Sequence, residues 1–425
     1  MSTNIQKNQI TEGIIWRQLL LFFFPILLGT FFQQLYNTID SVIVGQFVGK
    51  EALAAVGGSS AQIVAFVVGF FTGLSSGASV TIAQFFGAKD SRSANKGLHT
   101  AYAIAAFGGL ILTVSGIILT PFLLEMMNTP ADIVADSAVY LRIYFAGIIF
   151  VLIYNMGSAI LRATGDSKRP LYYLIVCCII NIVLDVLFVI VFHMGVMGVA
   201  VATLIAQAVS AVLVTLKLMR SEGILKLSVK QIRFHGSILK MQLKLGLPTG
   251  FEAILFSITN IAIQSAVNTF GTDTTAAWSA YGKLDAIFWM VSTAFGIAIT
   301  TFVGQNYGAG KMDRVRKSTR VCLLMDFIVS AVLVVFLIAA RFLLFRLFTN
   351  DSHVIEIGCD MLVLITPWYI VYVFIEVIAG ALRGVGNVVV PVAITLLGVC
   401  VLRIAWLAAM LKISPTISAI ILSYP

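Results

Sequence analysis

Long apolar runs alternate with short polar segments along the chain, and this alternation predicts helices that cross a membrane. A crossing helix needs about 20 mainly apolar residues. Eleven runs are long enough, and they cover residues 15–44, 52–83, 97–122, 132–161, 169–192, 197–219, 245–270, 275–304, 318–344, 354–382 and 388–411. A further apolar stretch begins at residue 413, but the sequence ends at Pro425, so we expect the last span to be incomplete in this chain. The pattern predicts an all-α polytopic membrane protein.

Composition strengthens this prediction. Of 425 residues, 59% are hydrophobic and 11% are charged, whereas about a quarter of the residues of a soluble domain are charged. These values exclude an ordinary soluble enzyme and a disordered chain. The five cysteines lie in apolar runs without metal-ligand spacing, and we interpret them as buried apolar residues. The sequence contains no phosphate-binding Gly-x-x-x-x-Gly-Lys-Ser/Thr loop, and we expect no cofactor.

Basic residues are distributed unevenly between the loops. The loops on one side of the predicted membrane carry only Lys50, Arg341, Arg346 and Lys412, and three basic residues fall within spans, Arg142, Lys283 and Arg403. The other Lys and Arg residues, including Arg162 and Arg383, belong to the side that holds the N-terminus. Because cytoplasmic loops carry an excess of Lys and Arg, we expect a cytoplasmic N-terminus in a bacterial plasma (inner) membrane. The net charge of +9 then reflects topology and does not indicate binding to nucleic acid.

The second half of the chain repeats the first at a shift of 221 residues. QFFGA at 84–88 corresponds to QNYGA at 305–309, and LRATGDSKRP at 161–170 corresponds to LRGVGNVVVP at 382–391. The shift covers six spans, so both copies have the same orientation. Transporters with parallel repeats of this kind bind their substrates near the membrane midplane, between the halves. We expect a first lobe over residues 1–219, a basic cytoplasmic linker over 220–244 and a second lobe over 245–425.

Polar residues inside the predicted spans of the first lobe gather in three helices. Such residues are costly in a membrane and are often functional. Gln33, Asn37 and Asp40 lie on one helical face of the first span, and Asn181 and Asp185 are one turn apart in the fifth. Thr203 and Gln207 have the same one-turn spacing in the sixth span. Two carboxylates, one carboxamide and one hydroxyl from these three helices could form a pocket lined with oxygen atoms, which suits a hard monovalent cation or a shared proton. Helix–helix hydrogen bonding is the alternative role of Asn181, Thr203 and Gln207.

The second lobe does not repeat these acids. At the shift of 221, Asp40 corresponds to Ile261 and Asp185 to Trp406, which argues for a single ion site in the first lobe. We expect Lys283 to neutralise a carboxylate on another helix, either as a structural ion pair or as a substrate contact, with Glu252 and Glu376 as candidates. The candidate residues of a cavity or substrate site are Gln33, Gln34, Asn37, Gln207, Asn260, Gln264, Glu252, Lys283, Asp285 and Glu376.

Three further patterns in the spans predict local structure. Pro25 removes a backbone hydrogen bond from the first span, so we expect a helix kink there. Glycines at four-residue spacing, Gly69, Gly73 and Gly77, predict a surface for close helix packing. The aromatic run at 22–24 is expected to face lipid.

The chain resembles the multidrug and toxic compound extrusion (MATE) family. The resemblance rests on QQLYNTIDSVIVGQFVG in the first span, on the duplicated six-span architecture and on the paired Gln-x-x-Gly-Ala and Leu-Arg-x-x-Gly elements. It is nearest to the bacterial branch whose ion site lies in the N-terminal lobe. The site residues of that branch match Asp40, Asn181, Asp185 and Thr203, where the coupling ion is H⁺ or Na⁺. The resemblance implies a V-shaped, two-lobed antiporter that exports amphipathic, often cationic compounds. We expect it to act as a monomer in the lipid bilayer.

Other functions fit the sequence less well. A lipid-linked oligosaccharide flippase would need several basic residues in its cavity to bind pyrophosphate, and acids outnumber bases within the spans. An integral-membrane enzyme would cluster His, Cys or acidic residues at one membrane face, but the four histidines are scattered, at His99, His193, His235 and His353. A channel would not need the duplication that a rocking transporter uses. We therefore expect an ion-coupled transporter and not an enzyme.

Overall fold

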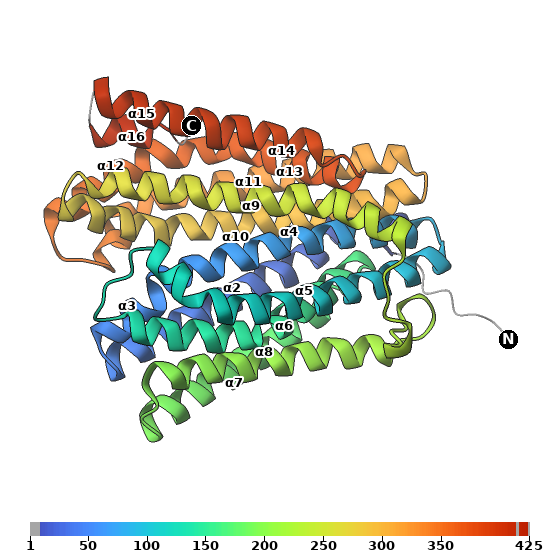
Figure 1. The fold of residues 1–425 in the computed structure, drawn as a ribbon. Helices are drawn as coiled ribbons and strands as arrows, with labels where there is room; N and C mark the ends of the chain where they lie inside the picture. Colours follow the sequence, from blue (N-terminus) through green and yellow to red (C-terminus); the bar gives the residue numbers. More distant parts are fainter. Residues whose placement is uncertain (1–8, 414–415, 424–425) are drawn as a thin grey trace.

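The structure is a computed structural model that describes residues 9–413 and 416–423, and the described residues form helices and loops without a strand (Figure 1). Eleven of its helical segments are long and apolar enough to cross a membrane. The prediction of an all-α membrane protein is confirmed. The first half consists of α1 (Gln9–Glu12), α2 (Ile15–Phe47), α3 (Lys50–Gly57), α4 (Ser59–Gly87), α5 (Ser91–Met126), α6 (Val134–Ala163), α7 (Lys168–Asp185), the π-helix η1 (Val186–Val191) and α8 (Gly195–Met219).

The second half follows a connection that includes the short 3-10 helices η2 (Gly223–Leu225) and η3 (Val229–Gln231). Since α9 begins at Gly236, the last part of the predicted linker forms the first turns of that helix. The half consists of α9 (Gly236–Asn268), α10 (Thr272–Gly308), α11 (Met312–Arg346), α12 (Ser352–Ile365), η4 (Thr366–Trp368), α13 (Tyr369–Gly384), α14 (Val389–Thr395), the π-helix η5 (Leu396–Leu402), α15 (Arg403–Ile413) and α16 (Ile417–Ile421).

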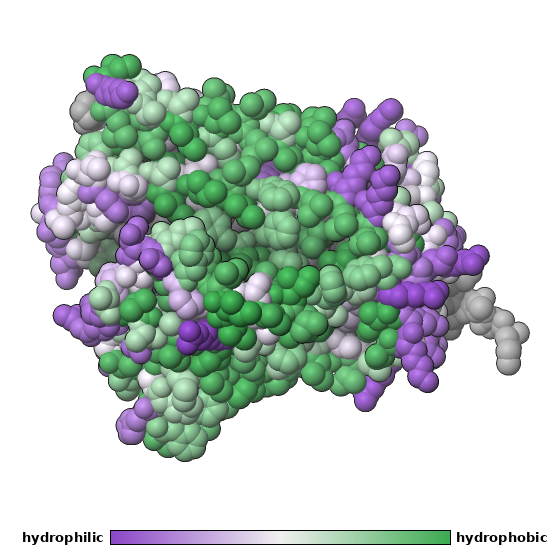
Figure 2. Space-filling model, in the orientation of Figure 1, coloured by the Kyte–Doolittle hydropathy of each residue, from purple (hydrophilic) through white to green (hydrophobic). Residues whose placement is uncertain are grey.

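The two halves lie side by side as two lobes, with α2–α8 below and α9–α16 above in Figure 1. Figure 2 shows a broad apolar band across the visible face of the molecule, with polar residues gathered toward its two ends. We call the end that holds α1, the connection 220–235 and the loops after α4 and α10 the basic end. The other end, where α3 lies, is called the opposite end. This distribution fits a bundle whose middle lies in lipid.

Helix α2 contacts both lobes. Near the basic end, Phe23 stacks on Phe295 of α10 with ring centroids 4.0 Å apart, and Phe22 meets Phe302 edge to face at 6.0 Å. Phe22 and Phe23 are only 4% and 3% exposed, whereas Phe24 is 53% exposed. The prediction that this aromatic run faces lipid is therefore wrong for two of its three residues, because that part of α2 packs on the second lobe.

Helix α9 makes the matching contact from the second lobe. Its glycines Gly246 and Gly250 lie directly on α4, where a Cβ at Gly73 or Gly77 would overlap the α9 backbone. The predicted close packing of Gly69, Gly73 and Gly77 is confirmed, because these small residues let the two backbones approach. Both crossing helices continue through an internal proline, which is Pro25 in α2 and Pro248 in α9. The predicted kink at Pro25 stays a prediction.

Candidate ion site and central cavity

Four residues of the first lobe meet inside the membrane-spanning part of the bundle. Asp40 comes from α2, Asn181 and Asp185 from α7, and Thr203 from α8. All four are buried, Asp40 at 7% and Asp185 at 0% exposure. The carboxyl of Asp40 interacts with Asp185, Thr203 and Asn181. The structure therefore brings together the residues predicted for the ion site.

The polar atoms of this cluster lack hydrogen-bond partners among the described residues. They are Asp40 Oδ1, both oxygens of Asp185, Oδ1 and Nδ2 of Asn181, and Thr203 Oγ1. The contacts of Asp40 thus bring the side chains together without the geometry of a hydrogen bond. A buried polar atom left unpaired costs about 1–3 kcal/mol, and two neighbouring carboxylates also repel each other. A cation or a proton among these oxygen atoms would relieve both costs.

Gln207 supports this cluster from beside it. Its Nε2 donates a hydrogen bond to the hydroxyl of Tyr36 over 3.3 Å, and both side chains are buried. Tyr140 and Tyr144 of α6 stack on each other with centroids 6.2 Å apart, and Tyr140 lies close enough to Asp40 to interact electrostatically. The predicted cavity residue Gln207 is therefore part of a packed polar and aromatic wall.

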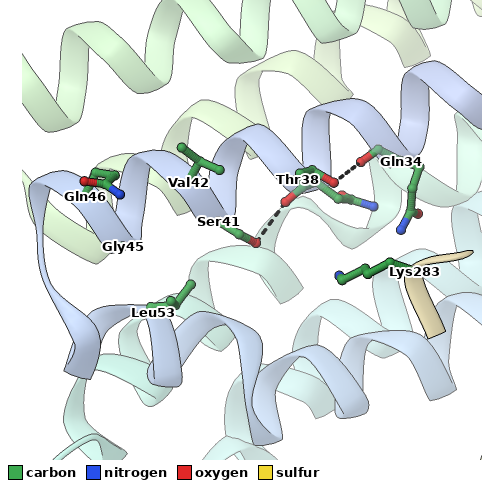
Figure 3. Close-up of a pocket in the computed structure, with 9 residues that line it drawn as sticks. Gln34, Thr38, Ser41, Val42, Gly45, Gln46, Leu53 and Lys283 are labelled. Carbon is green, nitrogen blue, oxygen red and sulfur yellow. Dashed lines mark hydrogen bonds between the residues drawn. The ribbon is translucent and has the colours of Figure 1, made fainter. Parts of the chain in front are cut away.

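The other polar residues of α2 have a different environment from Asp40. Gln33 and Asn37 are exposed, while Asp40 is buried against α7 and α8. Asp40 lies on the side of α2 that packs on the first lobe, whereas Gln33 and Asn37 lie on a neighbouring side of the helix that is left open. Gln34 and Asn37 line a pocket of about 440 Å³, which Lys283 of α10 reaches from across (Figure 3).

The prediction that Lys283 pairs with Glu252 or Glu376 is wrong. Lys283 is exposed, and no carboxylate lies within 4.0 Å of its ammonium group in the described part of the chain. Glu376 instead contacts Gly296, which is 13 residues further along α10, or about 20 Å at 1.5 Å per residue. The sequence placed these charges on the correct helices, but the axial distance separates them.

Polar residues near the opposite end of the second lobe bind one another. Asp285 accepts hydrogen bonds from Trp289 Nε1 over 2.8 Å and from the hydroxyls of Tyr281 and Tyr369. Asn260 accepts one from Arg403 over 3.3 Å. Gln264 donates to the Asn268 side chain over 2.8 Å. These predicted cavity residues form hydrogen-bonded clusters, and Asp285 and Asn260 also line a pocket of about 400 Å³.

The central cavity, of about 500 Å³, lies between α4 and α6 of the first lobe and α9, α10 and α13 of the second. Glu252 and Glu376 line it, as predicted, and so do Arg162 and Arg383. Arg383 Nη1 lies 3.6 Å from Glu376 Oε1. The Glu376 carboxylate lies directly against Gly296, where an added Cβ would make that side chain move. The charges of the cavity therefore come from both lobes.

The distribution of charges in the sequence did not predict that Arg162 and Arg383 line the cavity. Both belong to the Leu-Arg-x-x-Gly elements and were assigned to loops on the N-terminal side of the membrane. The structure places them in the last turns of α6 and α13, where their side chains turn into the cavity. The repeat itself was the signal, since two arginines related by the duplication should occupy equivalent places between the lobes.

The repeated motifs bind across the lobe boundary on the side of the cavity toward the basic end. Gln84 Nε2 of α4 donates to the carbonyl of Gly384 in the other lobe over 2.8 Å. Gln305 Nε2 of α10 donates to the carbonyl of Ala163 over 2.7 Å. At the shift of 221 residues, Gln84 corresponds to Gln305 and Ala163 corresponds to Gly384. The two hydrogen bonds are therefore equivalent, and each runs from one lobe to the other. We call this pair the glutamine latch.

Two glycines make the latch possible. A Cβ at Gly87 would overlap the carbonyl of Gln305, and a Cβ at Gly308 would overlap the carbonyl of Gln84. The Gln-x-x-Gly-Ala motifs thus cross at a distance that only glycine permits. Both motifs are recognisable in the sequence through their repetition, but the sequence of a helix does not indicate which helix it crosses.

Asp326 of α11 is another residue that the sequence analysis missed. It is fully buried, and Ser330 donates to its Oδ1 over 3.2 Å. Its Oδ2 has no hydrogen-bond partner among the described residues. A carboxylate inside an apolar run was the available signal. It lies in the second lobe, far along the chain from the first-lobe cluster.

Known proteins resemble the chain over almost its whole length. The probable multidrug resistance protein YoeA of Bacillus subtilis is 30% identical over 393 residues, which cover 91% of this chain and 84% of the relative. The probable multidrug resistance protein NorM of Thermotoga maritima is 27% identical over 96% of this chain and 88% of its own length.

A solved structure described as the outward-facing conformation of a multidrug resistance MATE family transporter of the MOP superfamily has the same fold. Its TM-score is 0.91 at 21% identity, covering 100% of this chain and 95% of that one. The MatE family model matches residues 25–187 and 248–407, once in each lobe. The chain therefore belongs to the MatE family of bacterial efflux transporters and is not an enzyme.

Proposed function

We propose that this transporter is an antiporter that exports amphipathic compounds, among them organic cations, in exchange for H⁺ or Na⁺. The observation that supports this most is the first-lobe cluster, in which buried oxygen atoms of Asp40, Asn181, Asp185 and Thr203 lack partners within the described chain. Oxygen ligands of this kind suit a hard cation, and the same carboxyls could share a proton. In this proposal the coupling ion is itself a transported substrate.

The coupling would pass through α2. Its half near the basic end packs on α10 of the second lobe, while Asp40 in its other half contacts α7 and α8. An ion that changes how Asp40 contacts the first lobe would therefore change how the two lobes are held together. A bend at Pro25 would contribute to this movement. By thermodynamic reciprocity, an ion that weakens substrate binding must itself be bound more weakly when substrate is present.

Alternating access would then open and close the cavity at its two ends. In the state described here the glutamine latch holds the lobes together at the basic end. Its release would open the cavity toward that end, which we propose faces the cytoplasm of a bacterial inner membrane. One monovalent ion crossing ~100 mV releases about 2.3 kcal/mol. At ~1.4 kcal/mol per tenfold, this supports roughly a 50-fold substrate gradient without ATP.

We further propose that the protein acts as a monomer of two lobes, over residues 1–219 and 245–425. The candidate cavity residues of the opposite end, Gln34, Asn37 and Lys283, would lie on the exit path, since they line the exposed pocket between α2 and α10. Asp285 and Asn260 would support that path through their hydrogen bonds.

A lipid-linked oligosaccharide flippase is the alternative transporter function. Pyrophosphate recognition calls for several basic groups without carboxylate partners in one cavity. The central cavity holds Arg162 and Arg383, but Glu376 lies 3.6 Å from the latter. This pairing favours export of smaller compounds with a single charged group.

The test is dye efflux from proteoliposomes driven in turn by a pH gradient and by a Na⁺ gradient. We expect one gradient to drive efflux, and Asp40→Asn to abolish it. Asp136→Asn is the matched control, because Asp136 is an exposed acid in the first turn of α6. Efflux that persists in Asp40→Asn would refute the first-lobe ion site. Failure of both gradients with the wild-type protein would refute ion-coupled export.

A further inference from the structure

We propose that Arg162 binds a carboxylate of the transported compound, so that the protein recognises substrates in which an acidic group is joined to an apolar body, with or without a positive group. This inference rests on the proposed export function and names its substrate chemistry. The central cavity has a volume of about 500 Å³, within the range of roughly 300–1,000 Å³ that is typical of small-molecule sites.

Arg162 brings a positive charge into the cavity without a carboxylate of its own. It is half-buried in the last turn of α6, and no Asp or Glu oxygen of the described chain lies within 4.0 Å of its guanidinium. The ionisable group that acts on it is the phenol of Tyr154. That hydroxyl donates to the carbonyl of Pro170 over 3.0 Å and carries no charge to offset the arginine.

Its repeat partner Arg383 has a different environment in the same cavity. Glu376 lies 3.6 Å from Arg383, and Glu252 is near enough to act on it as well. Both arginines stand in the last turn of their helices, where the helix dipole favours a positive charge. The dipole therefore explains why an arginine occurs at each place, but not why only one of them has acidic neighbours.

Among the described residues, those that the first lobe contributes to the cavity lining include hydrogen-bond donors and no acid. Asn155 and Ser76 line the cavity from the same lobe. An ionised carboxylate only accepts hydrogen bonds, and the planar fork of an arginine matches it with two parallel N–H donors. A partly buried charge without a counter-ion is costly, and a substrate carboxylate would remove that cost.

The facing wall would hold the rest of the molecule. Phe256, Trp289 and Tyr372 of the second lobe line the cavity with aromatic surface, and Glu252 adds a carboxylate that forms no ion pair within 4.0 Å in the described chain. An apolar ring system, with or without a positive group, fits this side. The charge asymmetry of the two walls would orient the substrate between the lobes.

A matched pair of dyes tests the proposal by equilibrium binding. The probes are a rhodamine with a free benzoic acid and the methyl ester of the same dye, bound to the purified full chain in detergent and measured by fluorescence polarisation. Since a hydrogen bond to a charged group contributes at least about a tenfold factor, we expect the acid to bind about tenfold or more tightly than the ester. Arg162→Gln should weaken binding of the acid and leave the ester unchanged, and Arg162→Lys should keep part of the preference.

Arg169→Gln is the matched control. Arg169 is exposed, pairs with Asp166 at 2.6 Å and does not line the cavity, so the preference for the acid should persist. Equal binding of acid and ester by the wild type, no measurable binding of the acid, or a preference that survives in Arg162→Gln would each overturn the proposal. The wild-type comparison needs no variant to fold. Because no gradient is applied, this result is independent of whether efflux is coupled to an ion.

Discussion

The two lobes are alike where they meet and different where they carry charge. Gln84 and Gln305 donate equivalent hydrogen bonds across the boundary at 2.8 and 2.7 Å. The position that holds Asp185 in the first lobe holds Trp406 in the second. Close backbone packing thus persists in both copies, because each lobe needs the same surface to close against the other. The buried acids have no such constraint and have diverged.

Under the function proposed above, the ion and the substrate would bind at different places. The ion would bind Asp40 and Asp185 in the first lobe, where Asp40 Oδ1 and both Asp185 oxygens have no hydrogen-bond partner among the described residues. The substrate would bind in the central cavity, to which the second lobe contributes the acids Glu252 and Glu376. Helix α2 would link the two places, since it carries Asp40 and packs on α10 through Phe23. A change at the ion site could therefore reach the lobe boundary through one helix.

The largest expected effect comes from removing a first-lobe acid while leaving the second-lobe acid in place. Asp185→Asn should abolish gradient-driven efflux, because the cluster loses one of its two carboxylates. Asp326→Asn should leave ion coupling intact, since it removes a buried carboxylate of the second lobe. Efflux from proteoliposomes measures both. Loss of coupling in Asp326→Asn would show that the ion site is not confined to the first lobe.

The second effect concerns the glycines of the boundary. Gly87→Ala and Gly308→Ala should each destabilise the state closed at the basic end by about 1–3 kcal/mol, because overpacking forces the backbones apart. A cysteine at Ser79, which lines the cavity, should then react faster with a membrane-impermeant maleimide added at the basic end. The native cysteines are buried, so background labelling should be low.

The control for these glycines is Gly57→Ala, because a Cβ at Gly57 meets no atom within 4 Å. It should leave labelling unchanged. Gly87→Ala and Gly308→Ala should act alike if the repeat is functional at this boundary. A large effect from one and none from the other would break the symmetry that the hydrogen bonds indicate.

A smaller effect is expected from removing the charge of Glu376, the acid nearest to Arg383. Glu376→Gln should lower the free energy of unfolding by about 1–3 kcal/mol, since it leaves a partly buried arginine without its nearest carboxylate. Glu252→Gln should cost less, because Glu252 has no ion pair within 4.0 Å among the described residues. Thermal unfolding in detergent gives both values. Equal losses would mean that the two acids share the arginine evenly.

The smallest effect is expected from the latch itself. Gln84→Leu and Gln305→Leu each remove one hydrogen bond to a carbonyl, which contributes about 0.5–1.5 kcal/mol. Labelling of the Ser79 cysteine should rise slightly and to a similar extent in both. Unchanged labelling in both variants would show that the hydrogen bonds accompany closure without stabilising it.

Much of the fold could be predicted because a membrane imposes strict rules on sequence. An apolar helix must be long enough to cross the membrane, and this requirement is visible in the sequence. The eleven spans predicted from it agree with the eleven apolar helical segments among the described residues. Asp40 and Asp185 stood out for the same reason, since a carboxylate in an apolar run needs an explanation. The repeat identified Gln84 and Gln305 as important without indicating their partners.

What the sequence could not predict depends on contacts between lobes. Phe22 and Phe23 look like lipid-facing residues until α10 covers them. Arg162 looks like a loop residue that marks topology, because its position at the end of a span does not tell which way its side chain turns. The pairing predicted for Lys283 was wrong because the sequence does not tell at what height along α10 Glu376 of α13 makes its contact. Hydropathy indicates which residues lie inside the membrane. It does not indicate toward which neighbour a side chain points, or how far apart two residues lie along a helix.

The central claim is that one ion site lies in the first lobe and opposes substrate binding. Its most direct test is the release of the coupling ion when a dye substrate is added to the purified protein, recorded in a weakly buffered solution with a pH indicator and a Na⁺-sensitive electrode. We expect the wild type and Asp326→Asn to release H⁺ or Na⁺, and Asp40→Asn to bind the dye and release neither. Ion release that persists in Asp40→Asn, or that disappears in Asp326→Asn, would contradict this account.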